Sequence, residues 1–181
     1  MADIIKTERL SLRPLVPEDA EAYFQAVNDY DVVKMTATWP WPVTEEYVHQ
    51  RLVESQDRDQ ARNTGLGIFL DNLLIGNMGG HLEGHEVTGD EVIWIGYMLG
   101  RSAWGQGFMT EALKALCSYL WGKLGTVDIY GEHFFDNPAS GNVMQKVGFT
   151  HVGAASAVWC KARQQSLPGE QYCLKVKGRQ A

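Results

Sequence analysis

The sequence predicts a single α+β domain over residues 1–181, built around a mixed β-sheet. Short apolar or alternating runs, typical of strands, are interspersed with longer runs of helical period. No repeat, low-complexity tract or proline- and glycine-rich linker separates these runs, and 181 residues suffice for one buried core. We therefore expect all the strands to join one sheet.

The N-terminal third predicts one strand and two helices. Residues 10–15 alternate between apolar and polar side chains, which indicates an opening strand. A helix is expected from about Pro17 to Asn28, because proline and acidic residues favour a first helical turn. The Trp-Pro-Trp-Pro run at 39–42 indicates a loop. Thr44 predicts the N-cap of a second helix, whose apolar face is formed by Tyr47, Val48, Leu52 and Val53.

The middle of the chain predicts a hairpin, a buried strand and a long helix. Residues 67–70 and 73–80 flank an Asp-Asn turn, which indicates a β-hairpin. Residues 91–99 form an apolar run typical of a buried strand. Apolar residues then recur at helical spacing from Phe108 to about Leu124.

The C-terminal third predicts three strands and a short helix. A strand is expected at 126–132, and further strands near 149–158 and 171–176. The helix between them begins at Asn137-Pro138 and ends at Gly148.

Composition excludes several classes of protein. With 22 acidic against 16 basic residues, the net charge of −6 does not suit a nonspecific nucleic-acid binder, so we expect no nucleic-acid partner. An acidic surface better suits a cationic substrate such as an amine. The three cysteines, Cys117, Cys160 and Cys173, form no CxxC pair or disulfide framework. Neither a signal segment nor a membrane-spanning run is evident, so we expect a cytoplasmic protein without a membrane partner.

A glycine turn after the apolar strand is the most informative motif. Gly105 and Gly107 lie between the strand at 91–99 and the helix that begins at Phe108. Such a junction directs free backbone N–H groups at one point, which favours a phosphate or pyrophosphate ligand. Position 110 is threonine, which excludes the dinucleotide fingerprint, and no Gly-Lys-Ser/Thr follows, which excludes a P-loop. A site for one pyrophosphate and a purely structural turn both remain.

A second motif joins this turn to a known family. Residues 95–99, 104–113 and 137–149 together resemble the GNAT superfamily of acetyl-coenzyme A-dependent N-acetyltransferases. The opening residues 7–14 resemble the branch that contains the ribosomal-protein N-terminal acetyltransferases. The resemblance implies a three-layer fold with a mostly antiparallel sheet of about six to seven strands. It also implies that helices flank the sheet and that its fourth and fifth strands splay apart.

The resemblance assigns the glycine loop to the pyrophosphate of coenzyme A, bound through main-chain amides. The family loop usually begins with Gln or Arg, whereas Ser102 stands at the matching position, so binding here is expected to depend on the backbone. The residues that the resemblance assigns to the cofactor are Tyr97, Met98, Ser102, Ala103, Trp104, Gly105, Gln106, Gly107, Phe108, Met109, Asn137 and Ser140.

Three of these residues have further implied roles and simpler alternatives. The Met98 N–H is expected to stabilise the oxyanion that forms on the thioester carbonyl, although the strand could equally be core alone. Asn137 is expected to reach the cofactor arm, or else to cap the following helix. Ser140 lies where relatives place a hydroxyl near the coenzyme sulfur, as a general acid, or it is only a polar residue of the first helical turn.

The general base is expected to be a carboxylate. Glu91 is the first candidate, because it opens the cofactor-binding strand where some family members carry a glutamate base. The alternatives are Glu132 and His133 at the end of the next strand, and His81 or Glu83 near the end of the hairpin. Each of these also fits a solvated residue at a strand end.

Two further features have weaker implications. His81 and His85 lack neighbours that would complete a ligand set, so we expect no metal. The aromatic loop at 39–42 lies in the region that shapes the acceptor pocket in the family, where tryptophan could hold a cationic amine or simply plug the edge of the core.

The sequence therefore predicts an N-acetyltransferase that moves acetyl from acetyl-CoA, its co-substrate, to a primary amine by direct attack. Cys117 is expected to be buried in the helix, so no covalent acyl intermediate is expected. The acceptor is a protein N-terminus or a small-molecule amine, and the enzyme is a monomer or a homodimer. The alternative is a noncatalytic acyl-CoA-binding or regulatory module of the same fold.

Overall fold

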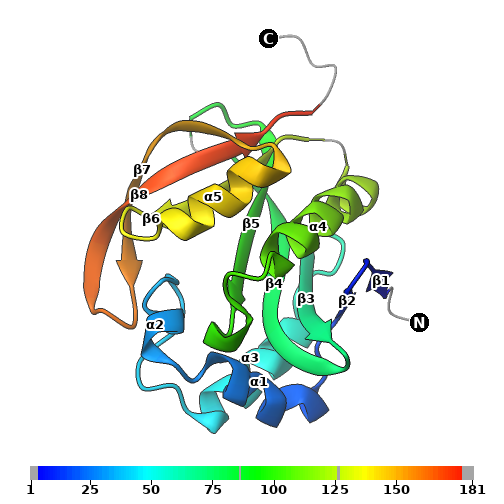
Figure 1. Cartoon of the computed structure of the whole chain (residues 1–181). Helices are drawn as coiled ribbons and strands as arrows, with labels where there is room; N and C mark the ends of the chain where they lie inside the picture. Colours follow the sequence, from blue (N-terminus) through cyan, green and yellow to red (C-terminus); the bar gives the residue numbers. More distant parts are fainter. Residues whose placement is uncertain (1–3, 86, 126, 177–181) are drawn as a thin grey trace.

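The computed structural model describes residues 4–85, 87–125 and 127–176 (Figure 1). Eight strands form one sheet in the order β1-β2-β3-β4-β5-β6-β8-β7. The strands are β1 (Ile5–Lys6), β2 (Leu10–Arg13), β3 (Asn63–Leu70), β4 (Leu73–Gly84), β5 (Glu91–Leu99), β6 (Ile129–Phe134), β7 (Thr150–Cys160) and β8 (Gln165–Leu174). The helices are η1 (Pro17–Asp19), α1 (Ala20–Val27), α2 (Tyr30–Val33), α3 (Glu45–Gln56), η2 (Arg101–Ala103), α4 (Phe108–Leu124) and α5 (Pro138–Val147).

The predicted mixed, mostly antiparallel sheet is confirmed. Only β5 and β6 are parallel, and they pair over three residues, from Ile93↔Ile129 to Ile95↔Gly131. By contrast, β5 pairs with β4 over its whole length. The splay therefore lies between residues 91–99 and 129–134, the fourth and fifth of the strands that the sequence predicted. The two-residue β1 raises the total to eight strands instead of six or seven.

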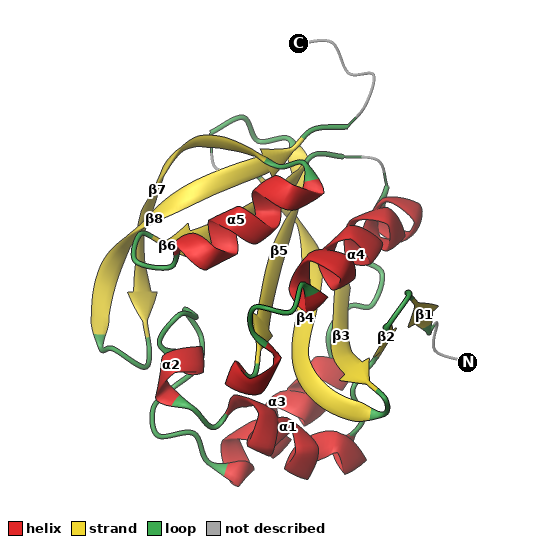
Figure 2. Cartoon of the chain, viewed as in Figure 1, coloured by secondary structure: helices red, strands yellow, loops and turns green. Residues whose placement is uncertain are grey.

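Helices cover the two faces of the sheet unequally. Figure 2 shows α4 and α5 side by side across one face, with α1, α2 and α3 at the end of the other. Leu113, Leu116 and Leu120 of α4 are fully buried in the larger core cluster. The smaller cluster joins α1, α2 and α3 to Met98 of β5 and Phe69 of β3. No helix in the described part of the chain is long and apolar enough to cross a membrane.

Local signals placed the ends of α4, α5 and β5 correctly, whereas β3, β4 and β8 are longer than expected, with bounds of Asn63–Leu70, Leu73–Gly84 and Gln165–Leu174. The Thr44 side chain accepts a hydrogen bond from the Tyr47 N–H at 3.1 Å, so it caps α3 as predicted. Gly148 ends α5 with φ of 110°, and Asp71 and Asn72 have the positive φ of a tight hairpin turn. Thr126, where we expected the strand of β6 to begin, lies outside the described residues.

An ion pair fixes η1 to the edge of the sheet. The Arg13 guanidinium donates to both carboxylate oxygens of Asp19, at 2.7 and 2.8 Å, and lies 3.9 Å from the centre of the Phe69 ring. Asp19 also accepts from the Val16 N–H at 2.9 Å. The hydrogen bond from Arg13 lowers the pKa of Asp19 below 3.8.

This pair generates a stability prediction. Replacing Asp19→Asn should lower the free energy of unfolding by about 1 kcal/mol at pH 7, a modest value because the pair is partly solvated. A lowered pKa contributes stability above its ordinary value of 3.8 and loses it as the pH falls through the lowered pKa. Urea unfolding of the two proteins should therefore converge in strongly acidic solution. A difference that stays constant with pH would contradict this explanation.

Candidate active site

The splay leaves part of one edge of β5 without a strand partner. The Ile93 N–H donates to Asp128 O at 2.9 Å on the β6 side, and the Gly100 N–H donates to Ile75 O at 2.8 Å on the β4 side. Successive backbone groups alternate between the two edges of a strand. Tyr97 and Leu99 therefore direct their N–H groups to the β6 side, beyond Ile95, where the ladder ends.

This alternation is contrary to our expectation for Met98. Its carbonyl lies beside Gly76 of β4, and its N–H has the same direction. The Met98 side chain is buried against α1, α2 and α3. The free N–H nearest to the end of the ladder belongs to Tyr97, one residue earlier in the strand. The sequence located the strand correctly. It did not show which of its N–H groups face β4 and which face β6, because the pairing with β4 determines that.

The glycine loop forms a partly free cradle before α4. Gly105 and Gly107 have φ of 74° and 80°, which explains glycine at both positions. The N–H groups of Ala103 and Trp104 are used in η2, where they donate to Gly100 O and Arg101 O. These two residues of the expected set therefore do not offer amides. Ser102 and Gln106 are exposed, while Phe108 and Met109 are buried at the start of α4, so the free amides begin at Gly105.

Sequence reasoning missed a cation beside this loop. Arg9 donates to Gln106 O at 3.1 Å, pairs with Glu111 at 2.7 Å and lies 4.5 Å from the centre of the Phe108 ring. Its guanidinium would also lie 3.6 Å from a methyl group at Gly107. A guanidinium next to free amides favours a phosphate ligand. The chain separation of 97 residues between Arg9 and Gln106 explains why no local pattern revealed the contact.

The far side of the splay carries two linked hydroxyl groups. The Tyr97 and Ser140 hydroxyls lie 2.9 Å apart, and the Tyr97 hydroxyl is 3.0 Å from Ser140 O. Burial raises the pKa of Tyr97, so this phenol stays protonated. Asn137 precedes α5, but its side chain does not cap the helix. The structure thus rejects the capping alternative for Asn137 and joins Ser140 to β5.

A buried histidine lies beneath the same turn of α5. His133 is 9% exposed, and its Nδ1 lies 2.8 Å from Phe134 O. A carbonyl oxygen only accepts, so a neutral His133 has its proton on Nδ1 and a lone pair on Nε2. That Nε2 has no hydrogen-bond partner among the described residues. It points towards Gly141 and the Tyr172 ring, on the α5 side of the sheet.

The two candidate glutamates lie in very different places. Glu91 begins β5, six residues before Tyr97, which places it about 20 Å away at the ordinary rise of a strand. It is exposed and pairs with Arg62 at 2.8 Å. The structure therefore does not bring Glu91 to the splay, contrary to our expectation. We expected Glu91 because it opens the cofactor-binding strand, but the length of that strand separates it from the splay.

Glu132 lies where β5 and β6 begin to part. Because Ile95 pairs with Gly131, Glu132 is next to Gly96, which is exposed and has open space above it. Gly131 faces α5, so Glu132 faces the opposite side of the sheet. It is exposed and accepts a hydrogen bond from Gln171 at 2.8 Å. The splay thus has hydroxyl groups on one face and a carboxylate on the other.

The remaining candidates are accounted for without a direct role at the splay. His81 pairs with Glu83 at 3.0 Å, whereas the His85 ring packs on Tyr130 with ring centres 4.8 Å apart. In the aromatic loop, Trp39 is buried against Tyr23 and Tyr47 and plugs the smaller core cluster. Trp41 is 43% exposed and packs on Tyr30 of α2.

Comparisons with known proteins identify the family of this chain. The family described as "Acetyltransferase (GNAT) domain" matches residues 9–150. The chain therefore belongs to the GNAT acetyltransferase family, and it is an N-acetyltransferase rather than a noncatalytic module of that fold.

The individual proteins that this chain resembles share less than 30% of its sequence. The chain is 28% identical over 155 residues to the uncharacterized N-acetyltransferase YoaA of Bacillus subtilis, covering 84% of this chain and 86% of that protein. It superposes with a TM-score of 0.80 on the ribosomal L7/L12 alpha-N-protein acetyltransferase RimL in complex with coenzyme A, at 21% identity over 98% and 100% of the two chains. The microcin C7 self-immunity acetyltransferase MccE, in complex with acetyl-CoA and AMP, gives a TM-score of 0.76 at 18% identity over 93% of each chain.

The close packing around Gly141 generates a second prediction. A methyl group at Gly141 would lie 2.6 Å from His133 Nε2 and 2.9 Å from the Tyr172 hydroxyl. Replacing Gly141→Ala should therefore lower the free energy of unfolding by about 1–3 kcal/mol, although alanine favours helices. Gly122→Ala in α4 is the matched control, because nothing lies within 4 Å of its added methyl group. That variant should gain about 0.5–1 kcal/mol. Chemical denaturation measures both, and equal stabilisation would refute the packing.

Proposed function

We propose that this protein transfers acetyl from acetyl-CoA to a primary amine by direct attack at the splay between β5 and β6. The observation that carries the proposal is the arrangement of groups on the two sides of that opening. Glu132 lies on one face, and the linked hydroxyls of Tyr97 and Ser140 lie on the other. If the amine enters beside the carboxylate, the coenzyme A thiolate leaves on the opposite face, beside the hydroxyls.

The chain offers coenzyme A two kinds of contact. The amides from Gly105 onward, at the N-terminus of α4, suit the pyrophosphate, and Arg9 adds a positive charge beside them. The free edge of β5 and the uncapped Asn137 side chain suit the amide groups of the pantetheine arm. The free edge of β5 leads through η2 directly into the glycine loop, so these two sites adjoin along the chain. The coenzyme complexes of similarly folded proteins support this assignment.

The chemistry follows from the positions of these groups. The acceptor ammonium first loses a proton to Glu132, which passes it to solvent. The amine nitrogen then forms a bond to the thioester carbon, and the Tyr97 N–H stabilises the negative charge on the carbonyl oxygen. As the carbon–sulfur bond breaks, the Ser140 hydroxyl protonates the thiolate, with the Tyr97 hydroxyl as its partner. The new amide nitrogen releases its second proton to solvent, and Ser140 regains from solvent the proton that it gave to the thiolate, so one proton is produced overall.

Direct attack suits the cysteines of the chain. Cys117, Cys160 and Cys173 are all buried. Burial raises the pKa of Cys117 to about 12, so its thiol stays protonated and is a poor nucleophile at neutral pH. A covalent acyl-cysteine is therefore not part of the proposal.

The acceptor is proposed as a class. The name of RimL describes a protein N-terminus as acceptor, and that of MccE describes an immunity function against a microcin. Both a protein N-terminus and a small-molecule amine suit an opening with an exposed carboxylate. We further propose that the enzyme works in the cytoplasm, as a monomer or homodimer, without a metal.

The proposed function is tested in two steps. Thermal shift and calorimetry with acetyl-CoA should first show binding. Release of the coenzyme thiol should then be measured with a panel of primary amines and N-terminal peptides. Binding followed by turnover of at least one amine supports the proposal. Binding without turnover on any amine would contradict direct transfer to a primary amine, and no binding would overturn the coenzyme A site as well.

The cradle is tested by a change of charge. Gly105→Glu should weaken coenzyme A binding by about 100-fold or more, because it places a carboxylate among the pyrophosphate-binding amides. Gly122→Glu carries the same change on the exposed surface of α4, 14 residues after Phe108 and in the last turns of the helix, and should leave the affinity unchanged. Calorimetry measures both dissociation constants. Equal affinity in the two variants would refute the location of the cradle.

The base is tested by comparing two glutamates. Glu132→Gln should lower kcat about 100-fold near neutral pH, with the affinity for acetyl-CoA unchanged. Glu91→Gln is the matched control and should have wild-type kcat, because Glu91 lies far from the splay and pairs with Arg62. Steady-state rates over a range of pH measure both. Loss of activity in the Glu91 variant alone would restore our first assignment.

A further inference from the structure

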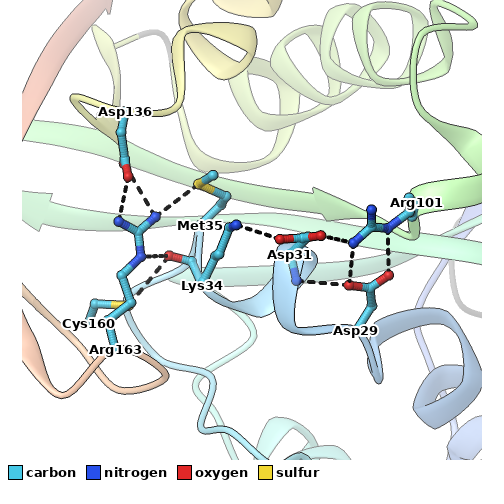
Figure 3. Close-up of polar contacts among 8 residues, drawn as sticks. All are labelled: Asp29, Asp31, Lys34, Met35, Arg101, Asp136, Cys160 and Arg163. Atoms are coloured by element: carbon cyan, nitrogen blue, oxygen red, sulfur yellow. Dashed lines mark hydrogen bonds and ion pairs between the residues drawn. The ribbon is translucent and has the colours of Figure 1, made fainter.

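The single-turn helix α2 is held at both ends by arginines from other parts of the chain (Figure 3). An isolated helix of four residues is far too short to persist by itself. Val32 and Val33 anchor the helix to the core, since both are buried in the cluster that contains Met98. Met98 and Gly96 face the same side of β5, so α2 lies on the side from which the amine is proposed to approach. Its position there depends on contacts outside the helix.

Arg101 fixes the N-terminal end of α2. The Asp29 carboxylate caps the helix by accepting from the Asp31 N–H at 2.8 Å. Arg101 donates to both oxygens of Asp29, at 2.7 and 3.0 Å, and also pairs with Asp31. The hydrogen bond from Arg101 lowers the pKa of Asp29, so the cap is ionised at neutral pH. Lys34 pairs with Asp31 and completes the cluster.

Arg163 fixes the other end. This residue lies in the turn between β7 and β8, and its side chain is only 9% exposed. Its Nε donates to the Lys34 carbonyl at 2.7 Å, at the C-cap of α2, and its Nη2 is 3.1 Å from Met35 Sδ. The rest of the guanidinium pairs with Asp136 at 2.6 Å. Asp136 directly precedes Asn137, on the β6 side of the splay.

The two arginines thus connect α2 to both walls of the splay. Arg101 is the first residue of η2, the turn that leads from β5 into the glycine loop. Its carbonyl accepts from the Trp104 N–H, and its guanidinium lies 5.8 Å from the centre of the Trp104 ring. An anion bound by the loop would restrict η2 and, through the same residue, the cap of α2. Arg163 makes the corresponding connection to the end of β6.

We propose that Arg101 and Arg163 are positioning residues that couple coenzyme A binding at the glycine loop to the order of α2, one wall of the acceptor site. The inference rests on the proposed function only in taking the loop as the coenzyme A site. The side chain of Arg101 contacts Asp29 and Asp31, not a group of the splay, so we assign it a positioning role.

The test is hydrogen–deuterium exchange of residues 29–36 with and without coenzyme A. In the wild type, saturating coenzyme A should slow exchange of these amides by at least about threefold. Arg101→Ala should abolish that slowing, while calorimetry gives a dissociation constant for coenzyme A within about threefold of the wild type. Arg101→Lys keeps the positive charge but cannot donate to both oxygens of Asp29 as a guanidinium does, so it should restore part of the slowing. Arg62→Ala breaks the remote pair with Glu91 and is the matched control, with wild-type slowing expected.

The outcomes separate this inference from the proposed function. A wild type that binds coenzyme A without slower exchange at α2, or an Arg101→Ala variant that keeps the slowing, overturns the coupling alone. A wild type that does not bind coenzyme A overturns the proposed function first. Arg163→Lys extends the test to the other end, with smaller slowing expected. If that buried substitution prevents folding, the Arg101 variants decide the question.

Discussion

The parting of β5 from β6 is the constraint on which the rest of the structure depends. A strand in the middle of a sheet satisfies its backbone groups through two neighbours, and unpaired groups inside a domain are costly. After Ile95, β5 keeps only β4, and the N–H groups of Tyr97 and Leu99 lose their ladder. The indole N–H of Trp104 donates a hydrogen bond to the Leu99 carbonyl at 2.8 Å, so the chain itself satisfies one of these backbone groups. The edge around Tyr97 is available to an extended ligand with amide groups of its own.

The same parting distributes the chemistry between two faces. Side chains alternate along β5 and β6, so neighbouring residues at the splay face opposite layers. Tyr97 and His133 face α5, whereas Gly96 and Glu132 face the side where only α1, α2 and α3 partly cover the sheet. A thioester between the strands would therefore have proton donors on one side and a proton acceptor on the other. No separate catalytic loop is needed for that arrangement.

The sequence was sufficient for most elements and for the family, but it missed β1 and α2 and could not provide contacts between distant residues. The glycine turn, the Thr44 cap and the helical period of α4 are local signals, and each predicted its element correctly. By contrast, α2 has four residues and no periodic pattern, and its caps come from Arg101 and Arg163. Arg9 reaches the glycine loop in the same non-local way. The expectation for the Met98 N–H was wrong because the pairing with β4 determines which N–H groups of β5 face β6, and no local pattern reveals that pairing.

Glu91 and Glu132 differ in their distance from the splay, and that distance is what separates them as candidate bases. Both are exposed glutamates near a predicted strand end, so residue type and exposure do not distinguish them. Glu91 begins its strand and is neutralised by Arg62, while Glu132 lies beside Gly96 at the point where the ladder ends. A glycine at that point leaves room for a substrate to approach the backbone, although neither φ nor crowding requires one there. In the proposed function, the open space over Gly96 and the adjacent carboxylate therefore mark the side from which the amine approaches, opposite to the Tyr97 and Ser140 hydroxyls.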